Sequence, residues 1–222
     1  MLRYAFHFIA LFQFSFGFSL GLDVGHTSYR YGALSSSCEK EYNYNLSLAK
    51  YIDKKLHNKA NIAITSNINT KDVSFFQRYN LSNEKDLFIS IHHDSVQPQY
   101  ITYNGKHCPQ TNYAQGFSIF VSKKNKHYEK SLEYAKRFAQ GLISRGLKPT
   151  LHHNEDIDGE RRLLLDKKLG IYQFDDLKVL KNAHSPAFLF EAGVIVNPKD
   201  ESLVRSISFK DSVVFALLGV FQ

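Results

Sequence analysis

One stretch constrains this chain more than any other: an apolar run from Leu87 to Ile91 that leads directly into His92, His93 and Asp94. Short apolar runs of this kind are typical of buried strands, and in open α/β sheets binding groups lie beyond the carboxyl ends of the strands. Side chains alternate between the two faces of a strand, so His92 and His93 must point in opposite directions. The run therefore predicts a central strand that presents His92 to a site at the rim of a sheet and leaves His93 a supporting or packing role.

Two other apolar strands are predicted to end in the same way. The strand over residues 20–24 leads through Gly25 to His26, and we expect the glycine to free the backbone so that the imidazole turns inward. The strand over residues 187–190 ends in Glu191. One such ending means little, whereas three together favour a metal site at the carboxyl ends of the strands.

A catalytic zinc ion takes three protein ligands and keeps one position for water. His26 and His92 supply two candidate ligands. For the third, Glu39 lies in a loop, whereas Glu41 lies in the first turn of a predicted helix, which gives its carboxylate a fixed direction. The helix dipole alone also favours an acid in a first turn, so a purely structural role for Glu41 stays open.

The rest of the chain alternates between strand and helix patterns, which predicts a single α/β domain with a largely parallel central sheet flanked by helices. A length of 222 residues and a hydrophobic content of 43% suit one domain with a substantial core. Further strands are expected over 62–65 and 117–121, and helices over 41–59, 127–145 and 211–221, with one more helix capped by Asn69-Thr70 and extending to about residue 84. The polar segments 95–115 and 149–160 are predicted to be surface loops, and the pattern over 163–180 is ambiguous.

Residues 1–17 have the positive start, apolar centre and small final residues of a secretory signal peptide, which leaves residues 18–222 as the domain. An uncleaved anchor is the alternative, and either case predicts a periplasmic or secreted domain. No later segment is long and apolar enough to span a bilayer. In an oxidising compartment Cys38 and Cys108 can form one disulfide, with two free thiols as the alternative.

The chain is basic, with a formal net charge of +7. This charge favours anionic partners such as nucleic acid, lipid head groups or an acidic cell-wall polymer. The lysines and arginines are scattered rather than gathered into a stripe, which, together with the secretory pattern, disfavours a nucleic-acid binder.

Four motifs resemble those of the zinc-dependent N-acetylmuramoyl-L-alanine amidases of bacterial cell-wall turnover, the amidase type 3 with an α/β fold. They are Leu22-Asp23-Val24-Gly25-His26, Glu41-Tyr42-Asn43, Asp86-Leu87-Phe88-Ile89-Ser90-Ile91-His92, and Ser185-Pro186-Ala187-Phe188-Leu189-Phe190-Glu191-Ala192-Gly193 followed by Asn197. Their order and spacing match the family over about residues 18–222. The chain departs from the family's usual residues at Thr27-Ser28, Ser66-Asn67, Asp94 and Val194, which bears on substrate details more than on the chemistry.

The resemblance implies one zinc ion per chain, held by His26, Glu41 and His92, with Glu191 as the catalytic group. It implies hydrolysis of the amide bond between N-acetylmuramic acid and the L-alanine of the peptidoglycan stem peptide. We expect a monomer that acts on peptidoglycan, with an activator protein as a further candidate partner. The alternatives are a wall-binding module without turnover, and another zinc peptidase or deacetylase that acts on the cell wall.

Several residues are weaker candidates. Asn197 and Arg161 are candidate substrate-binding residues, although Arg161 beside Arg162 also fits an ordinary surface pair. His152-His153, near Glu155, Asp156 and Asp158, are candidates for a second metal site, but adjacent histidines in a polar loop are expected to be solvated. The 95–115 loop follows the His92 strand and is a candidate cover for the site or a partner-binding segment.

Overall fold

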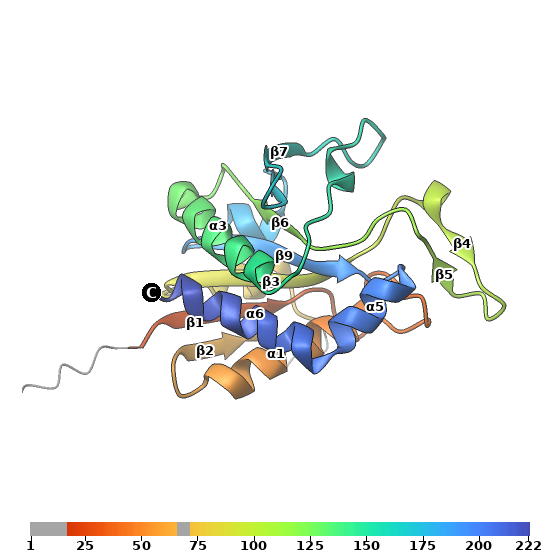
Figure 1. The fold of residues 1–222 in the computed structure, drawn as a ribbon. Helices are drawn as coiled ribbons and strands as arrows, with labels where there is room; N and C mark the ends of the chain where they lie inside the picture. The colour runs from red at the N-terminus through yellow and green to blue at the C-terminus, as the bar shows by residue number, and fades with distance from the viewer. Residues whose placement is uncertain (1–16, 66–71) are drawn as a thin grey trace, which may run out of the picture.

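A seven-stranded sheet forms the centre of the computed structural model, which describes residues 17–65 and 72–222 (Figure 1). The strand order is β2-β1-β3-β9-β6-β8-β7. The strands are β1 (Ser19–Val24), β2 (Asn61–Ile64), β3 (Leu87–Asp94), β6 (Ser118–Val121), β7 (Leu163–Asp166), β8 (Ile171–Gln173) and β9 (Ala187–Val194). The first four in spatial order, β2, β1, β3 and β9, are parallel, and β6 pairs antiparallel with β9. The expected α/β fold with a largely parallel sheet is confirmed.

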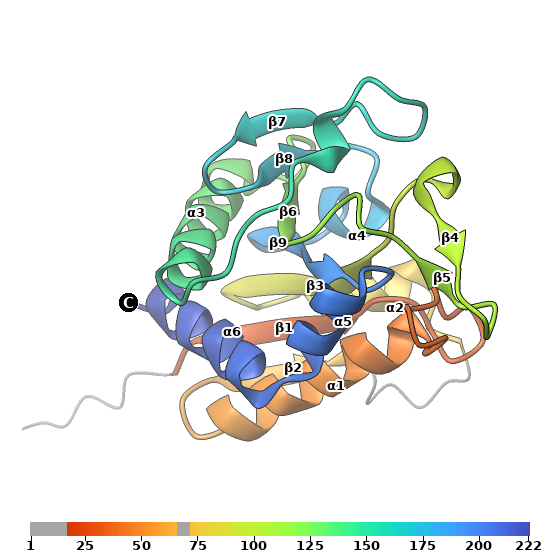
Figure 2. The same ribbon diagram turned by 45° about the vertical axis from the view of Figure 1, so that its right-hand side comes forward.

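Helices cover both faces of the sheet (Figure 2). On one face lie α1 (Glu41–Leu56), α3 (Tyr128–Ser144) and α6 (Ile207–Val220), which share the larger apolar core with the strands. On the other face, α2 (Phe75–Asn80) and α4 (Lys178–Lys181) contact each other. α5 (Pro198–Arg205) follows β9 and leads into α6.

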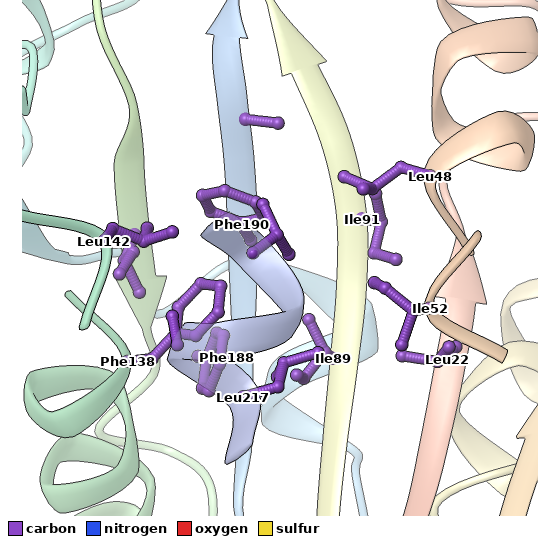
Figure 3. Close-up of a cluster of buried hydrophobic side chains, with 14 of the residues drawn as sticks. Leu22, Leu48, Ile52, Ile89, Ile91, Phe138, Leu142, Phe188, Phe190 and Leu217 are labelled. Atoms are coloured by element: carbon purple, nitrogen blue, oxygen red, sulfur yellow. The ribbon is translucent and has the colours of Figure 1, made fainter. Parts of the chain in front are cut away.

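The period of two along β3 decides which face each side chain reaches. Ile89 and Ile91 point into the larger core with Phe188 and Phe190 of β9 (Figure 3). Phe88 belongs to the smaller core on the opposite face. By the same alternation, His92 emerges on the face that α2 and α4 cover, and His93 on the face of α1.

Several boundaries differ from the sequence-based expectations. α2 begins only at Phe75, because Ser74 and Gln77 form a capping box, and the predicted cap Asn69-Thr70 lies outside the described residues. The ambiguous 163–180 segment contains the hairpin β7-β8 and the start of α4. α5 was not expected, although Asn197-Pro198 followed by two acids is an ordinary helix start.

The 95–115 segment forms a projecting arm that contains the short hairpin of β4 (Thr102–Tyr103) and β5 (Pro109–Gln110) (Figure 1). A disulfide joins Cys108 of this arm to Cys38, which is the bridged one of the two states that the sequence left open. The bond spans 70 residues of sequence and ties the arm to the loop that precedes α1.

The predicted signal peptide over residues 1–17 lies outside the described residues except for Gly17. Phe18 stacks on Phe221 with ring centroids 4.2 Å apart, so the described chain starts against its own last helix. Within the described ranges, no helix has both the length and the apolar character needed to cross a membrane.

Candidate metal centre and catalytic cleft

Glu41 lies between the imidazoles of His26 and His92. Its Oε2 is 3.0 Å from Nε2 of His26, and its Oε1 is 3.1 Å from Nδ1 of His92. The two rings face each other edge-on, with centroids 4.8 Å apart. The three residues that the sequence singled out therefore form a group that is able to hold a metal ion.

The turn after β1 explains how His26 reaches this group. His26 itself adopts a left-handed backbone conformation with φ of 66°, whereas Gly25 does not have a positive φ. The expectation that Gly25 supplies the turn is therefore wrong. Arg78 stabilises the turn, because its guanidinium donates to the backbone oxygens of Val24 and His26.

Gly25 is needed for space instead. A Cβ atom at Gly25 would lie 2.5 Å from Nε2 of His92, well inside van der Waals contact. Gly32 plays the same part on the other side, where a Cβ would overlap Glu41 and His26. Two glycines thus keep side-chain atoms out of the space around the His/Glu/His group.

Glu41 is buried and negatively charged. Burial alone would raise its pKa, but hydrogen bonds from His26 and His92 hold the pKa of this carboxyl far below its usual value. Two imidazoles and one carboxylate are a donor set that zinc accepts in catalytic sites. The residues present therefore fit a divalent metal ion of the zinc class.

His93 supports the group from behind. Its Nδ1 lies 2.7 Å from Oδ1 of Asn45, and its backbone N–H donates to Oε1 of Glu41. Burial lowers the pKa of His93 to about 3, so the ring is neutral. Asn45 also donates to Glu41 and to the backbone oxygen of Gly25, a bracing role that the sequence analysis missed. The predicted supporting role of His93 is confirmed.

Glu191 lies beside the group on the neighbouring strand, directly opposite His92 in the parallel register of β3 and β9. Its Oε2 is buried and has no hydrogen-bond partner among the described residues. Burial, together with the negative charges of Asp94 and Glu41, raises the pKa of Glu191 well above its usual value. A carboxyl group in this state can hold a proton and pass it on.

Two neighbouring cavities open at this rim. The larger, of about 660 Å³, is lined by His26 and His92, by residues of α2 and α4, and by equal numbers of basic and acidic side chains: Arg30, Arg78, Lys178, Asp23, Asp72 and Asp176. The smaller, of about 160 Å³, is lined by Glu191. Leu177 and Leu189 line both cavities and form a shared wall. His26 and His92 border the larger cavity, and the carboxyl of Glu191 borders the smaller one.

Comparison with known proteins identifies the family. Residues 20–218 match the family model described as N-acetylmuramoyl-L-alanine amidase. The chain belongs to this amidase family.

Individual relatives agree with this assignment. The chain is 22% identical over 221 residues to the Buchnera aphidicola protein named "Putative N-acetylmuramoyl-L-alanine amidase", covering 86% of this chain and 88% of that one. It is 32% identical over 193 residues to "Probable cell wall amidase LytH" of Staphylococcus epidermidis, covering 85% of this chain but only about half (52%) of that one. The amidase Ami1 of Mycobacterium smegmatis has the same fold, with a TM-score of 0.71 at 19% identity, over 92% of this chain and 97% of that one.

Two candidate substrate-binding residues of this amidase have other contacts. Asn197 is buried, accepts a hydrogen bond from the backbone of Lys199 as the cap of α5, and donates to the backbone oxygen of Ala114. Its amide thus holds the backbone at the start of α5 and at Ala114, and its contact with substrate stays a prediction. Arg161 is exposed and pairs with Asp156 and Asp158.

Arg162, the next residue, is closer to the candidate site than Arg161, because it lines a cavity there and Arg161 does not. Arg162 lines the cavity of Glu191, and its guanidinium lies 3.8 Å from the ring centroid of Phe174. Nothing in the sequence distinguished the two arginines, because both lie in the same polar segment.

The expectation of solvated histidines at positions 152 and 153 is wrong. Both side chains are buried and contact Asp94, at the end of β3. The acids that the sequence placed near them, Glu155, Asp156 and Asp158, do not belong to this cluster.

Proposed function

We propose that this amidase is zinc-dependent and hydrolyses the amide bond between N-acetylmuramic acid and the L-alanine of the peptidoglycan stem peptide. One observation carries the proposal: an ionised, buried Glu41 bridges two imidazoles, and beside them lies Glu191, whose buried Oε2 has no hydrogen bond to any residue that the structure describes. A module that only binds cell wall has no need of this pairing.

His26, Glu41 and His92 would hold the ion. When bound there, zinc supplies a water of pKa about 7 and polarises the carbonyl of the scissile amide. The chain's own contribution begins with fixed geometry: Arg78 holds the turn of His26, and Asn45 and His93 hold Glu41. Ligands that are oriented by such hydrogen bonds keep their donor atoms in place through the reaction.

Glu191 would move the protons. Its raised pKa suits a carboxylate that takes a proton from the attacking water and then gives it to the departing amine. Its position opposite His92 places it on the same face of the sheet as that ligand.

The location follows from the same chemistry. Peptidoglycan lies outside the cytoplasm, and the Cys38–Cys108 disulfide suits an oxidising compartment. We therefore infer that residues 1–17 direct export and that residues 18–222 act in the periplasm or outside the cell. We keep the monomer as the expected state. The CwlD amidase of Clostridioides difficile has been solved in complex with the GerS lipoprotein, and we include a protein partner of that kind among the candidates for this chain.

The test compares wild type with Glu191→Gln and His92→Ala on purified peptidoglycan. Mass spectrometry of the digest should show stem peptides that start with a free L-alanine amine, released by wild type only. Glu191→Gln should keep bound zinc and lose at least 10²-fold in rate, whereas His92→Ala should lose both. A wild-type digest with cut peptides or free acetate indicates a peptidase or a deacetylase, and an unchanged wall indicates a binding module.

A further inference from the structure

A second group of metal-capable side chains lies at the end of β3, on residues that the first group does not use. It consists of Asp94 and of the adjacent histidines in a short 3-10 turn, η3 (His152–Asn154). Oδ2 of Asp94 is 2.8 Å from Nε2 of His153 and 3.3 Å from Nε2 of His152. Three donor atoms on two distant segments thus lie within 4.8 Å of one another.

Both imidazoles are held from their outer side. Nδ1 of His152 lies 2.8 Å from Oγ1 of Thr150, and Nδ1 of His153 lies 2.8 Å from Oε2 of Glu160. Gln97 in turn donates to the other oxygen of Glu160. Metal-ligating histidines characteristically use their second ring nitrogen in this way, because the contact fixes which nitrogen faces the ion.

One nitrogen in the group makes no hydrogen bond within the part of the chain that the structure describes. This atom is Nε2 of His152, whose side chain is only 5% exposed. Buried polar atoms are rarely left unpaired. A cation between Asp94 and the two rings gives this nitrogen its missing contact.

The surroundings attract positive charge. The carboxylates of Asp94 and Glu160 flank the ring of His153, each 2.8 Å from one of its nitrogens. Two carboxylates with two imidazoles therefore carry an excess of negative charge in a place that solvent barely reaches. Divalent ions of the zinc class accept this mixture of nitrogen and oxygen donors.

We propose that Oδ2 of Asp94 and the Nε2 atoms of His152 and His153 form a second divalent-cation site of the zinc class. The ion would fasten the 150–162 segment to the end of β3. His153, Glu160 and Arg162 of this segment line the cavity of Glu191, so the second ion would fix one wall of that cavity. The site does not rest on the proposed function, because it shares no ligand with the first group.

The test is the zinc content of the purified protein, measured by mass spectrometry of the metal after loading with excess Zn²⁺ and desalting. Wild type should hold two ions per chain. His92→Ala should hold one ion, because the substitution removes a ligand of the first group only. His152→Asn should also hold one ion, because it removes a ligand of the second group only. The double variant should hold none.

His127→Ala is the matched control, because His127 is an exposed histidine at the start of α3 without a side-chain cap bond. It should keep both ions, and circular dichroism should show that every variant is folded. One ion in wild type with none in His92→Ala overturns the second site and leaves the cluster as a metal-free ion pair. Two ions in His152→Asn also overturn it, because the second ion then lies elsewhere.

Discussion

Replacing Gly25 with alanine tests the steric basis of the metal centre without removing a ligand. The new Cβ would lie 2.5 Å from Nε2 and 2.6 Å from Cδ2 and Cε1 of His92. Unbonded heavy atoms settle at about 3.5–4.0 Å, so the imidazole must retreat by about 1 Å. The backbone is unaffected, because Gly25 has no positive φ and its N–H still donates to Ile91.

The size of the effect follows from that displacement. A misplacement of about 1 Å in a reacting group costs about 10²-fold in rate. Disturbed support of a metal ligand costs about 10- to 100-fold in metal affinity. We expect Gly25→Ala to lose about 10²-fold in kcat/KM on peptidoglycan, or about 2.7 kcal/mol of transition-state stabilisation, and to release zinc to a chelator at a lower concentration than wild type.

Gly219→Ala is the matched control, since a Cβ at that helical position meets nothing within 4 Å. It should keep full activity and equal or higher stability. Both variants should show wild-type circular dichroism. Wild-type zinc affinity and turnover in Gly25→Ala would refute the reasoning, because the ring would then have room to spare.

Three further predictions concern stability. Asn45→Ala leaves the buried Nδ1 of His93 unpaired and should destabilise the fold by about 1–3 kcal/mol in urea unfolding; an unchanged midpoint would contradict the bracing role. The Cys38–Cys108 disulfide closes a loop of 70 residues, and its reduction should lower the free energy of unfolding by about 2–5 kcal/mol. The measurement is the fall in the thermal midpoint when a phosphine reductant is added. Burial alone would raise the pKa of Glu201, but hydrogen bonds from two serines, a tyrosine and an arginine lower it from 4.5 to about 2. The ionised carboxylate of Glu201 therefore stabilises the fold fully above pH 4.5, and this stabilisation is lost as the pH falls towards 2. In Glu201→Gln, the free energy of unfolding should change less steeply with pH over this range. The same slope in wild type and variant would contradict the stabilising role of Glu201.

The strands that lead to His26, His92 and Glu191 could be predicted from the sequence, because the pattern of each strand lies within a few neighbouring residues. An apolar run followed by His92 is enough to place a strand end, and the period of two separates His92 from His93. The same alternation along β9 puts Glu191 on the face opposite that of Phe190. The resemblance to the amidase family then selected Glu41, which the structure places between the two histidines.

What the sequence left undecided depends on contacts between distant segments. The sequence did not show that the amide of Asn197 caps α5 and holds the Ala114 backbone. Gly25 was expected to bend the chain, whereas it makes room for a ring 67 residues away, which no local pattern records.

The histidines at 152 and 153 show the same limit most clearly. Their segment is polar, which predicts solvent exposure, but a partner 59 residues earlier, Asp94, lies under them and compensates their burial. The sequence by itself determined which residues end the strands and which face each one takes. Only the tertiary structure decided which strand ends meet and which polar side chains are buried, because both follow from the order of strands in the sheet and from long-range charge pairing rather than from neighbours along the chain.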